Sequence, residues 1–138
     1  NWAGNEARID VTYARIDDMP AFARSWVAAN EGKTFDISTL AMFCVAMRRS
    51  VVDEVGPLDE RFGIGMFEDD DYARRVRQAG YRVICAEDVF VHHDGMASFS
   101  RLGDVEYRRV FDRNRRLYEE KWGEPWRPHQ SRKSSASR

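Results

Sequence analysis

Four consecutive acidic residues, Glu68-Asp69-Asp70-Asp71, constrain the fold of this chain more than any other feature. Neighbouring carboxylates repel one another and raise each other's pKa values, so a fold keeps such a run only where it is solvated, paired or used chemically. The run follows a loop of glycine and aromatic residues (63–67) and precedes a basic segment (72–79). We therefore predict a helix over 68–79 that begins at the acidic run and is closed by Gly80.

The composition indicates one soluble domain. The chain has 138 residues, of which 43% are hydrophobic and 33% are charged, and this length favours a single domain with its own core. Residues 127–138 hold four of the 22 basic residues and no acid, which leaves 18 basic residues against 23 acidic ones in the body. An acidic body argues against nucleic-acid binding, which needs a basic face. No apolar run approaches the length of a membrane span.

Hydrophobic periodicity predicts alternating helices and strands. The run 40–47 is almost wholly apolar, and we predict a strand buried on both faces. Cys44 lies in this run and Cys85 in a second strand-like run, so we expect both to be buried free thiols in a reducing cytosol. We expect residues 127–138, a basic Ser- and Arg-rich tail, to be disordered. The predicted helices cover 19–30, 48–55, 68–79 and 104–122, and the predicted strands cover 40–47, 81–86 and 89–92.

The four acidic residues are not equivalent. Acids favour the first turn of a helix because its free amides and dipole stabilise anions, and Asp71 is spaced to pair with Arg74 or Arg75. Asp70 and Asp71 are therefore predicted to be solvated or structural. Glu68 and Asp69 stand where the loop becomes helix, and a fixed carboxylate there is suited to accept a proton from a hydroxyl group.

Other residues allow two interpretations. Trp2 is suited to stack on a sugar or a base, or equally to plug a hydrophobic surface. Asp59 is placed to line a cleft, or to cap a turn with a salt bridge to Arg61. Gly63 and Gly65 would give a loop that responds to an acceptor, although turn geometry alone can require glycine.

Several motifs in order resemble the C-terminal half of a family 2 glycosyltransferase, an inverting enzyme with the nucleotide-sugar-binding GT-A fold. The resemblance covers about residues 36–100, and the segment beginning at Trp2 also resembles part of these enzymes. It is carried by the apolar run 40–47 with the arginines after it, by Val55-Gly56-Pro57-Leu58-Asp59-Glu60-Arg61-Phe62, by Phe67-Glu68-Asp69-Asp70-Asp71-Tyr72, by Ala79-Gly80-Tyr81-Arg82-Val83, and by His92 and Ser98-Phe99.

The resemblance implies a role for each matching position. Asp69 falls on the catalytic base of the family, and Glu68 would orient the acceptor or hold Asp69. His92 falls on a histidine that completes a divalent-cation site in related enzymes, although a histidine at a strand end is often only a surface residue. Such a site suits manganese, with magnesium as the alternative. Substrate would be bound by Trp2, Asp59, Gly65, Met66 and Phe67.

The resemblance also implies what the chain lacks. The family begins with a parallel nucleotide-binding half that ends in an Asp-x-Asp metal motif, and neither is found here. Asp69-x-Asp71 has that spacing but belongs to the acceptor-side motif. We therefore expect residues 1–126 to be the C-terminal portion of an α/β GT-A domain, a mixed sheet with flanking helices and a long final helix. The chain is expected to be an acceptor-side fragment that is inactive by itself.

In the complete enzyme, the partners implied are a nucleotide-sugar donor and a glycan, lipid-linked or protein acceptor. The expected location is cytoplasmic, with peripheral association at the inner face of the membrane. Self-association is expected through apolar surface that the run 40–47 leaves uncovered.

Two other functions remain open from the residues. The same surface could belong to a non-catalytic module that binds a glycan or a partner. A small metal-dependent hydrolase would need Glu68, Asp69 and His92 to converge on one metal ion.

Overall fold

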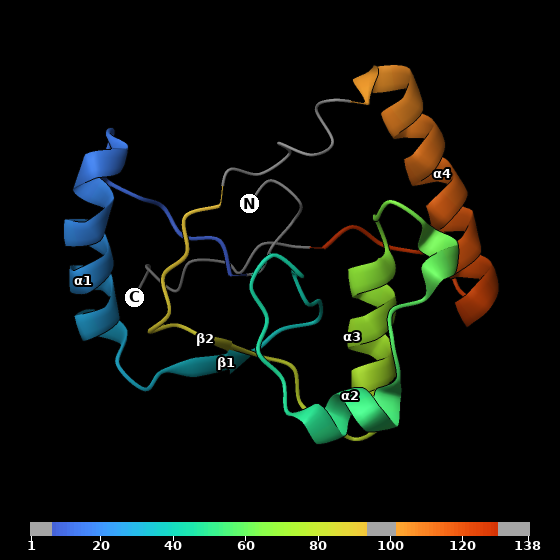
Figure 1. Cartoon of the computed structure of the whole chain (residues 1–138), viewed down its shortest axis with the longest axis horizontal. Helices are drawn as coiled ribbons and strands as arrows, with labels where there is room; N and C mark the ends of the chain where they lie inside the picture. Colours follow the sequence, from blue (N-terminus) through green and yellow to red (C-terminus); the bar gives the residue numbers. More distant parts are fainter. Residues whose placement is uncertain (1–6, 94–101, 130–138) are drawn as a thin grey trace, which may run out of the picture.

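The structure of the chain, a computed structural model, describes residues 7–93 and 102–129 and has a mixed α/β architecture (Figure 1). Helices α2, α3 and α4 gather at one end of the molecule, α1 lies at the other end, and a short two-stranded ribbon lies between them. The described elements, in chain order, are the 3-10 turn Ile16–Asp18, α1 (Met19–Asn30), β1 (Thr34–Asp36), α2 (Arg49–Val55), the 3-10 turn Glu60–Phe62, α3 (Glu68–Gln78), β2 (Ile84–Ala86) and α4 (Gly103–Trp122).

The predicted helices are confirmed, and their ends follow the predicted signals. α3 stops before Gly80, which takes a φ of +85°, and the Gly80 amide donates to the Arg77 carbonyl. α4 ends the same way at Gly123, whose φ is +68°. Only glycine enters this left-handed region without steric cost, so glycine after a periodic run is a strong stop signal.

The predicted strands are mostly wrong. The described sheet is a single antiparallel pair, with Thr34 opposite Ala86 and Asp36 opposite Ile84, and it is not a mixed sheet. β1 was not predicted, the predicted strand 81–86 is shortened to Ile84–Ala86, and residues 89–92 form no ladder. A strand needs a hydrogen-bonding neighbour as well as an apolar sequence, and the sequence does not reveal which segments meet.

The apolar run 40–47 is the clearest correction. It makes a turn, in which the Cys44 amide donates to the Ala41 carbonyl over 3.4 Å, and it joins no strand. Its inner residues pack against the core beside α3, whereas Phe43 and Met47 keep 42% and 38% of their surface exposed. Cys44 is exposed too, and Cys85 is half-buried, so the expectation of two buried thiols is wrong although both are free.

The described core consists of two hydrophobic clusters. The first joins α2 and α3 with the residues before β2 and contains Val51, Tyr72, Val76 and Val83. The second joins the start of α3 to α4 and contains Phe62, Phe67 and Tyr118, with half-buried Trp122 and Trp126 around them. α3 itself contributes to the first cluster, and Phe67, the residue that precedes α3, contributes to the second; the acidic run follows Phe67 directly.

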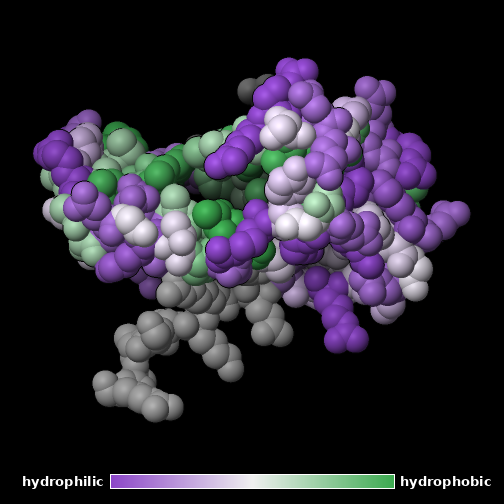
Figure 2. Space-filling view, turned by 90° about the horizontal axis from the view of Figure 1, so that it is seen from below, coloured by the Kyte–Doolittle hydropathy of each residue, from purple (hydrophilic) through white to green (hydrophobic). Residues whose placement is uncertain are grey.

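The α1 end is held by a few aromatic contacts. α1 has no buried residue. Phe22 packs against Tyr13 and Phe90, with ring centroids 5.4 and 5.2 Å apart, and Trp26 Nε1 donates to the Glu87 carbonyl over 2.7 Å. Hydrophobic residues line a hollow in the face seen from below, between the α1 end and the end that holds α2 to α4 (Figure 2). Within the described ranges, no helix is both long enough and apolar enough to cross a membrane.

This unequal packing predicts unequal local stability. Amide hydrogens of α1 should exchange with solvent much faster than those of α3, because α1 buries little apolar surface and can open without unfolding the core. Hydrogen exchange read by NMR or mass spectrometry would measure this. Equal protection of α1 and α3 would show that the chain unfolds as one unit.

Candidate functional site

The acidic run divides into two pairs with different environments. Asp70 and Asp71 are buried, with 7% and 0% of their surface exposed, and both are paired. Asp71 Oδ2 accepts from Arg75 Nε over 2.9 Å, and Asp71 Oδ1 lies 2.6 Å from Lys121 Nζ and 3.1 Å from Trp122 Nε1. The predicted structural role of Asp71 and its pairing with Arg75 are confirmed.

Asp70 binds the segment that follows α4. Its carboxylate accepts hydrogen bonds from Thr39 Oγ1 over 2.7 Å and from Trp126 Nε1 over 2.8 Å, and lies 2.6 Å from His129 Nε2. Burial by itself would raise the pKa of Asp70, but His129 and the two other donors outweigh it, and the pKa is lowered. His129 had no signal in the sequence that would single it out; it belongs to the predicted tail 127–138, most of which lies outside the described residues.

Glu68 and Asp69 lack such partners. Within the described part of the chain, neither carboxylate forms an ion pair, and Glu68 Oε2 is buried without a hydrogen-bond donor. Asp69 Oδ1 accepts from the Asp70 amide over 2.9 Å. Burial, with the negative charges of Asp70 and Glu68, raises the pKa of Asp69 to about 7. Burial, with the charge of Asp70, also raises the pKa of Glu68, although a backbone hydrogen bond opposes this rise.

The loop that leads into this pair is conformationally unusual. Gly65, Met66 and Phe67 all have positive φ, at +121°, +72° and +73°. Two successive left-handed residues other than glycine cost about 1–2 kcal/mol each, so tertiary contacts must hold them. Phe67 is also the residue before the first turn of α3, and its carbonyl accepts from the Asp71 amide over 3.0 Å. The loop thus sets where the first turn begins and where Asp69 lies.

Asn114 of α4 supplies that holding contact. It has no exposed surface, and its Nδ2 atom donates to the carbonyls of Phe62, Gly65 and Met66 over 2.7, 2.8 and 3.1 Å. Sequence reasoning missed this residue. The available signal was its spacing, because Asn114 stands four residues from both Val110 and Tyr118 on the buried stripe of α4. A polar residue in that stripe needs a buried hydrogen-bonding partner.

The other predicted site residues are dispersed. Asp59 caps the turn before Phe62 and pairs with Arg61 over 2.6 Å and Lys121 over 2.8 Å, which confirms the capped-turn interpretation. The hydrogen bonds from Arg61 and Lys121 lower its pKa. Gly65 and Phe67 are buried and Met66 is half-buried. Trp2 lies outside the described residues.

His92 does not join the acidic pair in a metal site. It is exposed, and its Nδ1 atom lies 2.5 Å from the Tyr13 hydroxyl. In the described ranges, no group of three or more His, Cys, Asp or Glu side chains is arranged to hold a metal ion. Glu68, Asp69 and His92 therefore do not form the three-ligand set that a metal-dependent hydrolase would need.

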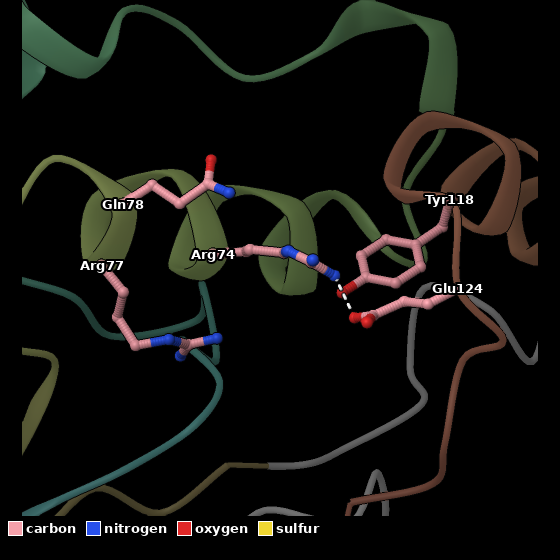
Figure 3. Close-up of a pocket in the computed structure, with 5 residues that line it drawn as sticks. All are labelled: Arg74, Arg77, Gln78, Tyr118 and Glu124. Carbon is pink, nitrogen blue, oxygen red and sulfur yellow. Dashed lines mark hydrogen bonds and ion pairs between the residues drawn. The ribbon is translucent and has the colours of Figure 1, made fainter.

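One hollow lies beside α3 and α4 and another lies along α4, and neither is lined by Glu68 or Asp69. The first, of about 330 Å³, lies beside α3 and is shown in Figure 3. Its Arg74 points toward Tyr118 and Glu124, forms an ion pair with Glu124, and has its guanidinium 4.2 Å from the Trp122 ring centroid. Because that arginine is already paired and stacked, it serves α3–α4 packing. The second hollow, of about 550 Å³, is lined by Arg61, Arg113, Arg116, Leu117 and Glu120.

Comparison of the chain with family models, curated proteins and solved structures gives no match.

The division of the acidic run predicts opposite effects of one substitution at two neighbouring positions. The pKa of Asp69 is higher in the folded chain than the ordinary value of 3.8, so its ionisation favours the unfolded state, and stability falls as the pH rises from about 4 to about 7. Asp69→Asn should therefore raise the free energy of unfolding at pH 8 by about 1–3 kcal/mol and leave it unchanged near pH 3. Urea unfolding at both pH values would measure the difference.

Asp71→Asn is the matched comparison. This change leaves Arg75 and Lys121 without their carboxylate, so we expect it to lower the free energy of unfolding at pH 8 by about 3–5 kcal/mol. If Asp69→Asn destabilised the chain as much as Asp71→Asn does, the distinction between the two pairs would be wrong.

Proposed function

We propose that the chain is the acceptor-side part of an inverting glycosyltransferase and that Asp69 is its general base. One observation carries the proposal: Asp69 is a half-buried carboxylate without an ion-pair partner in the described ranges, and its pKa of about 7 matches the range in which a general base works. The motif order around it supports the same assignment. The carboxylate of Asp71, by contrast, is occupied by Arg75 and Lys121 and has no exposed surface from which to reach a substrate hydroxyl.

The proposed reaction is a single displacement. Asp69 takes the proton from an acceptor hydroxyl while that oxygen attacks the anomeric carbon of a nucleotide-diphospho-sugar. The new carbon–oxygen bond forms on the face opposite the leaving group, and the bond to the diphosphate breaks. Glu68 stands beside Asp69, and its negative charge helps to keep the pKa of Asp69 high. Of the residues expected to contact substrate, Gly65, Met66 and Phe67 form the loop that leads to Asp69. Asp59 is instead paired with Arg61 and Lys121, and Trp2 lies outside the described residues.

A divalent cation, manganese or magnesium, belongs to the proposal for the complete enzyme only. It would neutralise charge on the leaving diphosphate. His92 is exposed, and it would have to break its contact with Tyr13 to bind such an ion. The described residues do not supply the other ligands. We therefore assign no step of the reaction on this chain to a metal.

The remaining parts of the proposal concern partners and location. The donor would be bound mainly by a nucleotide-binding half outside this chain, and the acceptor would be a glycan, a lipid-linked glycan or a protein. We propose a cytoplasmic location with peripheral contact at the inner membrane face. The exposed Phe43 and Met47 would support self-association or contact with that nucleotide-binding half.

The proposal is tested by release of nucleoside diphosphate from a panel of nucleotide-diphospho-sugars. The protein that carries this chain would be incubated with glycan and lipid-linked acceptors and with manganese or magnesium. Asp69→Asn should lower turnover by roughly 10²–10⁴-fold, because an amide cannot accept the proton, with little change in substrate affinity.

Asp53→Asn is the control. Asp53 is an exposed acid of α2 that pairs with Arg49, and its loss should leave turnover unchanged. Wild-type turnover in Asp69→Asn would refute the base assignment. No release with any donor in the panel would count against glycosyl transfer itself.

A further inference from the structure

We propose that Asn114 is a positioning residue for Asp69: it holds the 61–67 loop in the conformation from which the first turn of α3 begins. This inference rests on the proposed function only in treating Asp69 as the general base. The contacts that carry it are those of the loop, of α4 and of the start of α3.

Two neighbouring residues of α4 bind four carbonyls of the loop. Asn114 Nδ2 binds the carbonyls of Phe62, Gly65 and Met66, and Arg113 Nη2 binds the carbonyl of Arg61 over 3.2 Å. Arg113 Nη1 also donates to Asn114 Oδ1 over 3.3 Å. With its oxygen facing a guanidinium and its nitrogen facing three carbonyls, the Asn114 amide has one consistent orientation.

The contacts act where the loop needs support. Met66 and Phe67 are left-handed without being glycine, and they would relax toward ordinary backbone geometry if the carbonyls of Gly65 and Met66 lost their donor. Phe67 precedes α3, so relaxation there would shift the first turn and the side chains of Glu68 and Asp69. Water would then reach the Asp69 carboxyl more freely.

A second observation separates this role from simple packing. The charged groups that face Asp69 are Glu68 and Asp70, and Asp70 is in turn paired with His129. In the described part of the chain, Asn114 forms no hydrogen bond or ion pair with Glu68, Asp69 or Asp70, and its amide nitrogen binds backbone carbonyls of the loop instead. The titration midpoint of Asp69 therefore reports whether the 61–67 loop keeps its conformation.

The experiment follows the Asp69 carboxyl by carbon-13 NMR from pH 4 to pH 9, with the resonance assigned by Asp69→Asn. Wild type should titrate with a midpoint near 7. Asn114→Leu keeps the branch at Cγ and the number of side-chain heavy atoms but removes the hydrogen bonds, and we expect the midpoint to fall by about one unit or more, toward the ordinary aspartate value. Adding Met66→Gly to Asn114→Leu should bring the midpoint part of the way back up, because glycine adopts the left-handed conformation without support.

Val110→Ala is the matched control. Val110 is buried on the same stripe of α4, one turn earlier, and cannot bind the loop carbonyls. It should lower stability and leave the Asp69 midpoint in place. An unchanged midpoint in folded Asn114→Leu, or an equal fall in Val110→Ala, would overturn the inference.

Two further arms keep the test decisive. If Asn114→Leu does not fold, Arg113→Gln replaces it, because Arg113 binds the Arg61 carbonyl and Asn114 Oδ1 from the solvent side. A smaller fall in the Asp69 midpoint would then support the inference, and no fall would overturn it. Failure of sugar transfer is a separate result. A shifted midpoint without transfer would uphold the role of Asn114 and reject the proposed function, whereas transfer with an unshifted midpoint would do the reverse.

Discussion

Asp71 has no exposed surface, and its carboxylate lies between Arg75 of the same helix and Lys121 and Trp122 of α4. Arg75 also donates to the carbonyls of Val55 and Pro57 at the exit of α2, over 2.9 Å in each case. One buried carboxylate therefore ties three helices together. Removing either partner of such a pair leaves a buried charge uncompensated, which is why the rest of the α2–α4 end depends on it.

The candidate site follows from this packing. Asp70 and Asp71 are held by side chains from α4, from the segment after it and from Thr39, whereas Glu68 and Asp69 have no ion-pair partner among the described residues. The raised pKa of Asp69 is the product of its own burial first, and then of the negative charges of Asp70 and Glu68 beside it. Four residues of nearly the same chemistry acquire two different roles because only two of them point into the interface with α4.

The helices were predictable because their signals are local. Apolar spacing, the glycines that follow α3 and α4, and the acidic first turn of α3 all lie within a few residues of the structure they specify. The strands were not, because the apolar run 40–47 found no hydrogen-bonding neighbour and β1 paired with β2 across about fifty residues of sequence. Apolar composition indicates burial, and pairing depends on which segments meet.

The sequence by itself determined the position of the site: a carboxylate run at a helix start, preceded by glycines, with Asp71 spaced to reach Arg75. Only the tertiary structure decided which carboxylates are paired across the fold, because Lys121, Trp126 and His129 come from at least fifty residues away. It also decided that Asn114 of α4, which no sequence motif marks, binds the loop that precedes Asp69. Ionisation and backbone strain depend on what surrounds a group, and those surroundings exist only once distant segments have packed together.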